Sequence, residues 1–200
     1  MDERSTPARA PIEIAVPIGP RDRDRLRAGD QVALTGPVFT ARDATHELLS
    51  AQLRHAGELP YGLAGQTLFY AGPTPAAAGR PLGAVGPTTA KRMDVYTPEL
   101  LRAGITATIG KGPRSDEVRR ACGRYGAVYL AAVGGAAALL ARHVRGAEVV
   151  AYPELGAEAL MRLELEGFPA FVAIDARGED LFAVAAAEWR GACGPRTEAP

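Results

Sequence analysis

The sequence has little cysteine, since Cys122 and Cys193 are the only two among its 200 residues. Two isolated thiols are too few for a disulfide scaffold or for a tetrahedral zinc site, which needs four closely spaced ligands. Net charge is also missing, because 23 Lys and Arg residues balance 23 Asp and Glu residues. Without an excess of positive charge the chain offers no broad basic field, so we expect no nucleic-acid partner.

Long hydrophobic runs are absent as well. The two longest, residues 127–133 and 136–141, are separated by Gly134 and Gly135. Neither approaches the roughly 20 apolar residues that a membrane helix needs. The N-terminal residues, MDERSTPARA, are polar and lack the apolar core of a secretory signal. These absences predict no membrane association and a cytoplasmic location.

What the sequence contains is typical of one globular domain. Hydrophobic residues make up 47% of the chain and charged residues 23%, which is ordinary for a soluble protein. The length suits a single domain, and no internal repeat or linker-like stretch divides it. We expect a flexible N-terminus over residues 1–10, a folded domain over 11–190, and a flexible tail over 191–200.

Short β-type runs alternate with helical segments along the chain, which predicts an α/β fold with a partly parallel sheet. Strands are expected at residues 12–16, 31–35, 67–70, 105–109, 127–131, 148–151, 160–165 and 170–175. Helices are expected at residues 43–55, 97–103, 115–125 and 136–143. Residues 71–87 are rich in proline and glycine and predict a structured loop, and Gly167-Phe168-Pro169 predicts a break between the last two strands.

The strongest local signal is a loop with two hydroxyls and two cations. Residues 86–94 read GPTTAKRMD and present Thr88, Thr89, Lys91 and Arg92. Hydroxyls hydrogen-bond to small anions, and a guanidinium binds a carboxylate through two parallel bonds. The same residues also fit the start of a helix, with one Thr as its cap and both cations in solvent. Spacing alone leaves both interpretations open.

A second candidate is Lys111 in the segment Ile109-Gly110-Lys111-Gly112, which ends a predicted strand. Open parallel sheets bind ligands at that end of their strands, and the glycines on either side would let a ligand approach the backbone. A nucleotide P-loop is excluded, because it needs four residues between its glycines and Ser or Thr after the lysine. Here Gly104 and Gly110 bracket five residues, and Gly112 follows Lys111.

A third candidate is the strand-to-helix turn at residues 36–46, which carries Arg42, Asp43 and His46. Asp43 is interpreted as a helix N-cap rather than as a catalytic acid, because that position needs a cap. Arg42 can meet an anion beside the positive end of the helix. His46 fits local packing or acid–base work. The turn at residues 133–136 fits either an anion-binding nest or close helix packing.

Five stretches carry a resemblance to a known family. They read GDQVALTGPVFTARDATHELL, GPTTAKRMD, IGKG, RYGAVYLAAVGGAAALLA and LEGFPAFVAIDARGEDLF, and together they span roughly residues 29–182 in family order. They resemble the β subunit, or C-terminal domain, of the class I iron-sulfur hydro-lyases, the fumarase and L-tartrate dehydratase family. The resemblance implies a single swivelling β/β/α three-layer domain with a partly parallel central sheet.

The resemblance also implies a hydro-lyase that reversibly adds water to, or removes it from, a C4 dicarboxylate. In that family an α subunit supplies three cysteines to a [4Fe-4S] cluster whose fourth iron stays open. With two cysteines and no cluster-ligand motif, this chain is expected to hold no metal and to be active only with the α subunit. The implied assembly is an α2β2 heterotetramer, and the implied small-molecule partner is a dicarboxylate.

Residue roles also follow from the resemblance. Arg42, Arg92 and Lys111 would bind the substrate carboxylates, and Thr88 or Thr89 would face the carbon at which the proton moves. A Thr hydroxyl is a poor base at neutral pH. Proton transfer by Thr88 or Thr89 therefore requires Arg92 or Lys111 to stabilise the alkoxide. The residues expected to support these groups without touching substrate are Asp43, His46, Gly110 and Gly112.

Two other functions are weighed against the enzyme subunit. A non-catalytic swivelling module could hold an anion or a partner with the same residues. A free-standing hydrolase or transferase would need a nucleophilic residue next to a general base, and the sequence shows no such combination. The joint presence of Arg42, Thr88, Arg92 and Lys111 favours the enzyme subunit. Lys91 stands where the family motif has a small residue, and the choice among fumarate, tartrate and mesaconate stays open.

Overall fold

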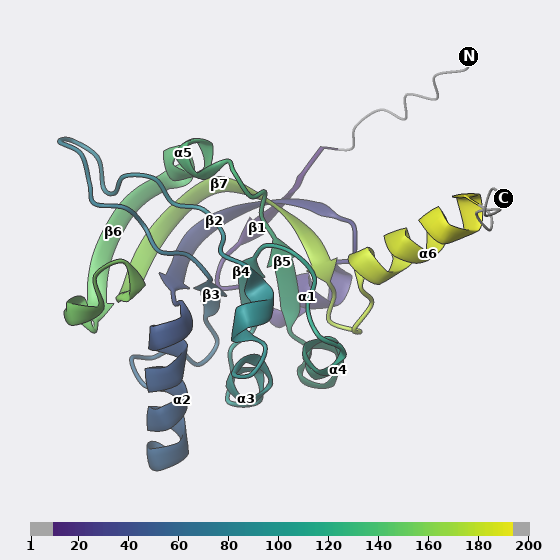
Figure 1. The fold of residues 1–200 in the computed structure, drawn as a ribbon, viewed down its shortest axis with the longest axis horizontal. Coiled ribbons are helices and arrows are strands. Elements are labelled where there is room, and N and C mark those ends of the chain that lie inside the picture. Colours follow the sequence, from purple (N-terminus) through teal and green to yellow (C-terminus); the bar gives the residue numbers. More distant parts are fainter. Residues whose placement is uncertain (1–9, 194–200) are drawn as a thin grey trace, which may run out of the picture.

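The computed structural model describes residues 10–193, and their strands form one seven-stranded sheet in the order β1-β2-β3-β4-β5-β7-β6 (Figure 1). The strands are β1 (Ile12–Ala15), β2 (Gln31–Thr40), β3 (Thr67–Phe69), β4 (Ala107–Gly110), β5 (Val128–Ala131), β6 (Val144–Ala151) and β7 (Leu160–Ile174). Strands β1 to β5 are parallel to their neighbours, whereas β7 is antiparallel to β2, β5 and β6. The predicted α/β fold with a partly parallel sheet is confirmed.

Strand β7 joins β5 back to β2, so that five strands, β7 included, form a closed ring. It pairs with β2 from Met161 to Phe171 and with β6 along its first residues, and its last residues pair with β5. The ladder therefore runs β2-β3-β4-β5-β7 and returns to β2. A buried apolar cluster with members on each of these strands forms the larger part of the core, which includes Leu34, Phe69, Ile109, Leu130 and Phe168.

The predicted break at Gly167-Phe168-Pro169 is wrong, because β7 continues through it. Pro169 pairs with Ala33 and Phe168 pairs with Leu34, and the register then shifts before Gly36. Gly167 adopts a φ of 60° and donates its N–H to the Thr35 hydroxyl at 3.0 Å. The irregularity is therefore a bulge within one strand, held by the burial of Phe168 in the core.

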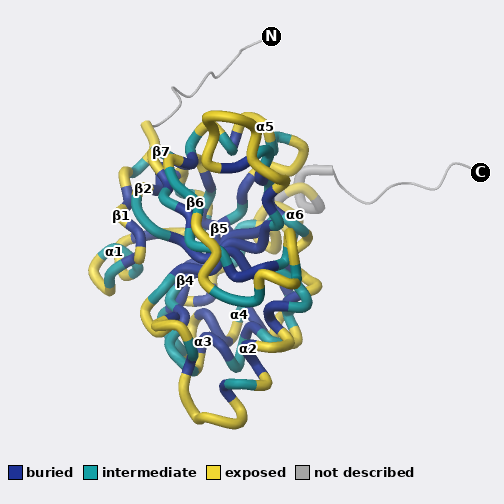
Figure 2. The backbone as a smooth tube through the Cα atoms, turned by 90° about the vertical axis from the view of Figure 1, so that its left-hand side faces the viewer, coloured by how far each residue is buried: buried dark blue, intermediate teal, exposed yellow. Residues whose placement is uncertain are grey.

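Three helices cover one side of the sheet: α2 (Asp43–Ala56), α3 (Thr97–Arg102) and α4 (Asp116–Tyr125) (Figure 1). Their apolar faces form a second buried cluster with the adjacent face of the sheet. The buried backbone accordingly gathers in the middle of the molecule (Figure 2). Ser115 caps α4 by accepting the N–H of Val118, and Gly57 ends α2 in the left-handed conformation. The predictions for these three helices are confirmed.

The remaining elements are short or peripheral. They are helices α1 (Pro20–Arg25), α5 (Ala137–Leu140) and α6 (Leu181–Cys193), and the 3-10 helices η1 (Ala90–Met93), η2 (Ala141–His143) and η3 (Pro153–Glu158). Helix α6 is not among the helices expected from the sequence. Residues 1–9 of the predicted N-terminus and 194–200 of the predicted tail lie outside the described residues. Between residues 10 and 193, no helix combines the length and the apolarity needed to cross a bilayer.

Candidate active site

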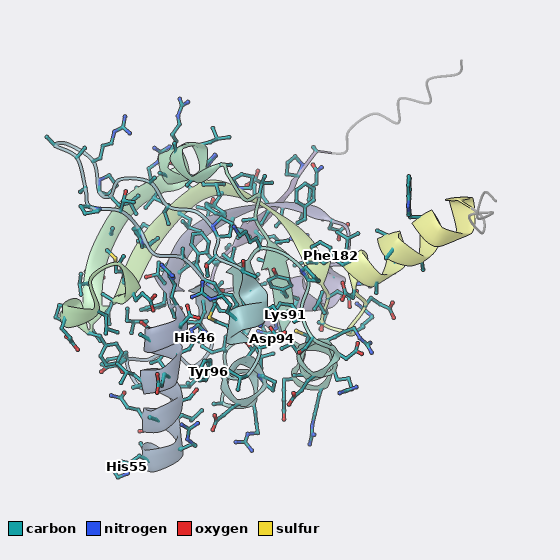
Figure 3. The ribbon with its side chains drawn as sticks, in the orientation of Figure 1. His46, His55, Lys91, Asp94, Tyr96 and Phe182 are labelled. Carbon is teal, nitrogen blue, oxygen red and sulfur yellow. The ribbon has the colours of Figure 1, made fainter. Side chains whose placement is uncertain are left out.

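The predicted site residues lie where the parallel strands end. Arg42 and Asp43 follow β2, Gly72 follows β3, and Lys111 follows β4 directly. Because β2 to β5 are parallel, their carboxyl ends meet at one edge of the sheet, which is where such sheets bind ligands. Figure 3 labels His46 on α2 and Lys91 and Asp94 at η1, and Arg92 of the same 3-10 helix pairs with Asp43 at the start of α2.

The Thr88–Ala90 backbone is fixed between two of these strand ends. Thr88 donates its N–H to the Tyr70 carbonyl at 2.7 Å and accepts the N–H of Lys111 at 3.1 Å, and Ala90 donates to the Lys111 carbonyl at 2.9 Å. A Cβ on Gly110 would lie 2.8 Å from that of Ala90. Gly110 thus allows the loop to approach the strand end, instead of opening the backbone to a ligand as expected. Gly112 supplies a turn with a φ of 81°.

The helix-start interpretation of this loop is partly right. The 3-10 helix η1 begins at Ala90, directly after Thr89, but the Thr89 side chain makes no capping hydrogen bond. The Thr89 hydroxyl therefore makes no hydrogen bond to the backbone of η1. Thr89 is exposed, whereas Thr88 is half-buried.

Arg92 and Asp43 form a two-bond ion pair. Arg92 donates from Nε to Asp43 Oδ1 at 2.9 Å and from Nη2 to Oδ2, and its Nη1 lies 3.5 Å from the Thr88 hydroxyl oxygen. The prediction that Asp43 caps α2 is wrong, because Asp43 makes no capping bond and its carboxylate is engaged by Arg92. The guanidinium of Arg92 thus joins the start of α2 to the Thr88 loop.

Arg42 has a carboxylate partner of its own, Glu158. Its Nη2 lies 3.3 Å from Glu158 Oε1, while Oε2 of the same carboxylate accepts the N–H of Ala44 at 2.9 Å. Glu158 therefore performs the N-terminal capping of α2 that was assigned to Asp43. The buried Nε of Arg42 makes no hydrogen bond within residues 10–193. No local sequence pattern indicates Glu158, because it is 114 positions away from Ala44.

Lys111 lies against the glycine turn that follows β5. A Cβ on Gly134 would be 3.1 Å from Lys111 Cδ and 3.7 Å from Nζ. The observed neighbour of Gly134 is thus the Lys111 side chain, so the contact supports neither helix packing nor an anion-binding nest directly. The ion pairs found among the described residues leave Lys111 without a carboxylate partner, in contrast to Arg42 and Arg92.

His46 is fully buried and holds the backbone of Arg42. Its Nδ1 lies 2.8 Å from the Arg42 carbonyl oxygen, so this nitrogen carries the proton, and its ring packs on Tyr70 and Tyr96 at 5.1 and 5.9 Å. Burial, partly offset by the hydrogen bond to Arg42, lowers the pKa of His46 to about 4. His46 is therefore neutral near pH 7 and supports the site by packing.

This burial predicts a pH-dependent stability. The unfolded chain takes up a proton on His46 near pH 6.5, whereas the folded chain resists it until about pH 4. The free energy of unfolding should therefore be highest above about pH 6.5 and fall by about 1.4 kcal/mol per pH unit below it. Urea denaturation between about pH 7.5 and about pH 5 measures this slope. His46→Gln should flatten the slope, and His55→Gln, at the exposed end of α2, should leave it unchanged.

The sequence analysis missed a buried arginine beneath these loops. The side chain of Arg114 is 0% exposed, and it donates to Asp94 Oδ1 at 2.6 Å and to the Thr97 hydroxyl at 2.7 Å. Its guanidinium also lies over the rings of Tyr70 and Tyr129, at 5.2 and 4.8 Å. Burial opposes its charge, but Tyr70 and Asp94 outweigh burial and raise its pKa, so Arg114 stays charged.

Arg114 joins the two loops that carry the predicted cations. Asp94 ends the GPTTAKRMD segment and also accepts the N–H of Ser115 at 2.7 Å, while the Tyr129 hydroxyl donates to the Gly112 carbonyl at 2.8 Å. The positions of Arg92 and Lys111 are therefore set by one buried polar network. The sequence indicated Arg114 only as a charged residue next to the helix cap Ser115, and such a pattern is common on protein surfaces.

The site lies open on the molecular surface. The side chains of Arg92 and Asp43 are 47% and 36% exposed, and Lys91 is exposed beside them. Within residues 10–193 no group of three or more His, Cys, Asp or Glu side chains could hold a metal ion. Cys122 is buried in α4, and burial raises the pKa of its thiol to about 12. The described residues thus offer cations and hydroxyls but no metal ligand set.

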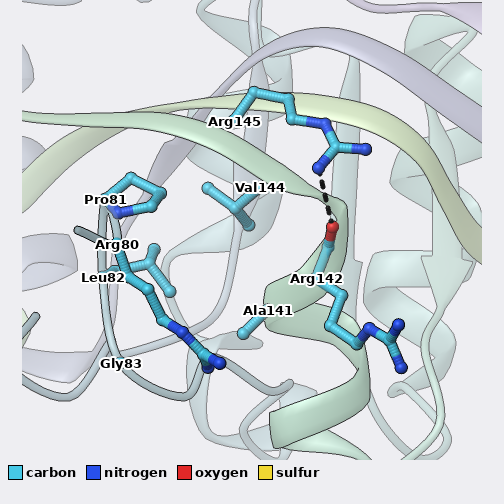
Figure 4. A pocket seen from close by; sticks show the side chains of 8 residues that line it. All are labelled: Arg80, Pro81, Leu82, Gly83, Ala141, Arg142, Val144 and Arg145. Carbon is cyan, nitrogen blue, oxygen red and sulfur yellow. Dashed lines mark hydrogen bonds between the residues drawn. The ribbon is translucent and has the colours of Figure 1, made fainter. Parts of the chain in front are cut away.

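A second basic cavity lies apart from these loops. Its volume is about 270 Å³, and it is lined by Arg80 to Gly83 of the long loop and by residues of η2 and β6 (Figure 4). Arg142 and Arg145 also line it, and Arg145 pairs with Glu166. It shares no residue with the predicted site.

The sequence of this chain is similar to a known family and to several known proteins. The sequence model of the family described as "Fumarase C-terminus" matches residues 3–185. The anaerobic class I fumarate hydratase of Escherichia coli (strain K12) is 43% identical over 155 residues, which are 76% of this chain and 28% of that protein. The chain therefore spans about 28% of the length of the fumarate hydratases it matches.

Two shorter relatives are matched over most of their length. The L(+)-tartrate dehydratase subunit beta of Escherichia coli (strain K12) is 33% identical over 175 residues, 85% of this chain and 86% of that protein. A putative subunit of the same name from Methanocaldococcus jannaschii is 36% identical, over 81% of this chain and 86% of that protein. With most of its length matched by the family model and by these subunits, the chain belongs to the fumarase C-terminus family.

Proposed function

We propose that this chain is the β subunit of an iron-sulfur hydro-lyase of the fumarate hydratase or tartrate dehydratase type. The observation that carries the proposal is that Arg42, Arg92, Lys111 and Thr88 extend from segments that meet at the carboxyl ends of parallel strands, with Arg92 3.5 Å from the Thr88 hydroxyl. Three cations and a hydroxyl at one edge suit a dicarboxylate whose neighbouring carbon gains or loses a proton. Two relatives that the chain matches along most of their length are named as beta subunits, which supports the same assignment.

Reversible hydration requires that both carboxylates be held, the hydroxyl be polarised and a base stand at the adjacent carbon. In the proposed mechanism Arg42 and Lys111 receive substrate carboxylates with donors that the protein leaves free. Arg92 is oriented by Asp43 and presents its remaining N–H groups towards Thr88. A [4Fe-4S] cluster, when bound by the partner, would supply the Lewis acid for the hydroxyl.

Of the two threonines, we assign proton transfer to Thr88. Its Oγ1 lies 3.5 Å from Arg92 Nη1, and the positive guanidinium would stabilise the developing alkoxide. Thr89 is exposed and contributes its backbone to the pairing with Lys111. Thr88 also accepts the N–H of Lys111 on its carbonyl, so the backbone from which Lys111 extends is fixed beside Thr88.

The exposure of the site supports a partner that covers it. A charged contact gains strength when water is excluded, and Arg92 is half exposed in this chain. We therefore propose an iron-sulfur-binding α subunit, assembled with this chain as an α2β2 heterotetramer in the cytoplasm. The swivelling β/β/α three-layer domain forms part of the same proposal, because a domain that rotates could open and cover the edge at which the strands end.

The isolated chain is expected to bind no iron-sulfur cluster and to show no hydro-lyase activity. A cluster with one open iron needs three thiolates, and the sequence has two cysteines, of which Cys122 is buried with a raised pKa. Anaerobic reconstitution with iron and sulfide, followed by visible absorption and a fumarate or tartrate hydration assay, tests this directly. Addition of the α subunit should restore both signals.

Two outcomes would contradict the proposal in different ways. A brown, active protein without any partner would show that this chain is a whole enzyme. An assembled complex that holds its cluster but converts none of the dicarboxylates would favour the non-catalytic module, which binds an anion without turnover.

A further inference from the structure

We infer that Glu158 is a positioning residue that sets the orientation of Arg42 for a substrate carboxylate. The inference rests on the proposed function, in which Arg42 is one of the carboxylate-binding cations. Glu158 lies on η3, far from the motifs of the site in sequence, and no pattern in the chain singles it out.

Glu158 contacts the start of α2 at three points. Its two carboxylate oxygens bind Arg42 Nη2 at 3.3 Å and the Ala44 N–H at 2.9 Å, and its backbone carbonyl accepts the Thr45 hydroxyl. The Arg42 side chain is 27% exposed and that of Glu158 is 25% exposed, so the pair is partly shielded from water. One carboxylate thus ties the guanidinium to the helix from which Arg42 extends.

The other side of the guanidinium is confined by backbone. A Cβ on Gly72 would lie 3.0 Å from Arg42 Nη1 and 2.7 Å from the Ala157 carbonyl oxygen. Gly72, shortly after β3, therefore lies against both the Arg42 side chain and the segment that carries Glu158. Held in this way, Arg42 keeps part of its guanidinium exposed for a ligand, since Glu158 engages only Nη2 and the side chain is 27% exposed, whereas the Nε is buried.

The backbone that presents Glu158 is unusual. Tyr152 has a φ of 57° and Gly156 a φ of 58° with a ψ of −117°. Only two non-glycine residues between positions 10 and 193 have positive φ, Tyr61 and Tyr152, and their rings meet edge to face at 5.6 Å. Such conformations persist only where the surroundings impose them, and they concentrate at functional sites.

Packing of η3, the segment that carries Glu158, against the rest of the protein does not account for this backbone geometry. A cavity of about 430 Å³ lies between the segment and the Pro73–Leu82 loop, and Gly156, Ala157 and Ala159 line it. The segment is therefore not backed by a filled core on that side. Its polar contacts to Arg42, Ala44 and Thr45 are what fix Glu158 in place.

Two opposite effects are expected from a carboxylate beside a substrate-binding arginine. It repels a dianionic substrate, and it restricts the guanidinium to one orientation before substrate arrives. Ordering one long side chain on binding weakens affinity by about three- to tenfold, whereas a partly exposed charge is screened by salt. We therefore expect positioning to dominate at physiological ionic strength.

The test uses the chain assembled with its α subunit and compares wild type, Glu158→Gln and Glu99→Gln. The amide introduced by Glu158→Gln keeps an acceptor for the Ala44 N–H but presents no charge to Arg42. KM for the dicarboxylate should therefore rise about three- to tenfold, with kcat within about twofold. Glu99 pairs with exposed Arg54 at 3.2 Å on another face, and its variant should behave as wild type. A KM that stays unchanged or falls would overturn the inference.

A second variant separates backbone position from charge. The Cβ introduced by Gly156→Ala meets nothing within 4 Å, so its effect arises from the positive φ alone. It should move Glu158 and raise KM in the same direction as Glu158→Gln. A wild-type KM in a folded Gly156→Ala variant would show that the segment's geometry does not serve Arg42.

A double-mutant cycle with Arg42→Ala distinguishes failure of the inference from failure of the proposed function. If Arg42→Ala weakens turnover and Glu158→Gln adds no further loss in that background, Glu158 acts through Arg42. If Glu158→Gln costs the same factor in both backgrounds, the positioning role is wrong while Arg42 keeps its assignment. If Arg42→Ala itself leaves kcat/KM unchanged, the proposed role of Arg42 fails, and the inference fails with it.

Discussion

Replacing Arg114 with Met is expected to lower the free energy of unfolding by about 3–5 kcal/mol, the usual cost of removing one partner of a buried ion pair. Asp94, whose side chain is only 12% exposed, would lose its ion-pair partner. The Thr97 hydroxyl and the rings of Tyr70 and Tyr129 would also lose their contacts with the guanidinium. Urea denaturation of the chain at neutral pH measures the change.

Arg54→Met provides the matched control. Arg54 also pairs with a carboxylate, Glu99 at 3.2 Å, but its side chain is 60% exposed. Exposed pairs contribute about 0–1 kcal/mol, so this variant should unfold almost like wild type. Equal losses in the two variants would contradict the structural role of Arg114, because burial would then make no difference to the pair.

Arg92→Ala and Lys111→Ala are expected to reduce kcat/KM of the assembled enzyme by about 30- to 1000-fold each, or about 2–4 kcal/mol of transition-state stabilisation. Each would remove a charge-assisted contact from a site that the proposed α subunit would close to water. Arg92→Lys should restore little activity, because an ammonium cannot make the two parallel bonds to Asp43 and also present a donor to Thr88. Steady-state kinetics with melting curves separates this loss from unfolding.

Lys91→Ala is the internal control for the same loop. Lys91 is exposed and adjacent in sequence to Arg92, but it has no part in the proposed carboxylate contacts. Its removal should leave kcat/KM within about threefold. If Lys91→Ala damages activity as much as Arg92→Ala, the assignment of Arg92 rather than Lys91 to the site is wrong. If neither variant matters, the chain binds no anion through this loop.

The order and type of most elements could be predicted from the sequence because their signals are local. Ser115 and Gly126 stand at the two ends of α4, and the apolar period of residues 43–55 matches the buried face of α2. The break expected at Gly167 failed because a buried Phe168 stabilises the continuous strand more than glycine and proline disfavour it. Tertiary packing overrode local propensity there.

Some residues of the candidate site likewise have a local sequence signal, and others have none. Arg42 and Lys111 could be proposed from the sequence because they follow predicted strands, and Thr88 because it stands in a short motif of hydroxyls and cations; the structure brings these segments to one edge. Glu158 and Arg114 were not found, because their partners are distant in sequence and an isolated charged residue looks like any solvated one. The cap of α2 was misassigned for the same reason, since the true acceptor comes from η3.

The ring of strands described above also constrains how the chain folds. Its closing contacts join β2 to β7, and the Met161 N–H meets the Thr40 hydroxyl across 121 positions. Such a high contact order predicts slow folding, on a scale of milliseconds to seconds once the whole chain is present. At a synthesis rate of about 5–20 residues per second, β2 would emerge about 6–24 s before its partner. Throughout that interval the unpaired edge of β2 is open to other chains, so the arrival of β7 decides when a nascent chain becomes resistant to aggregation.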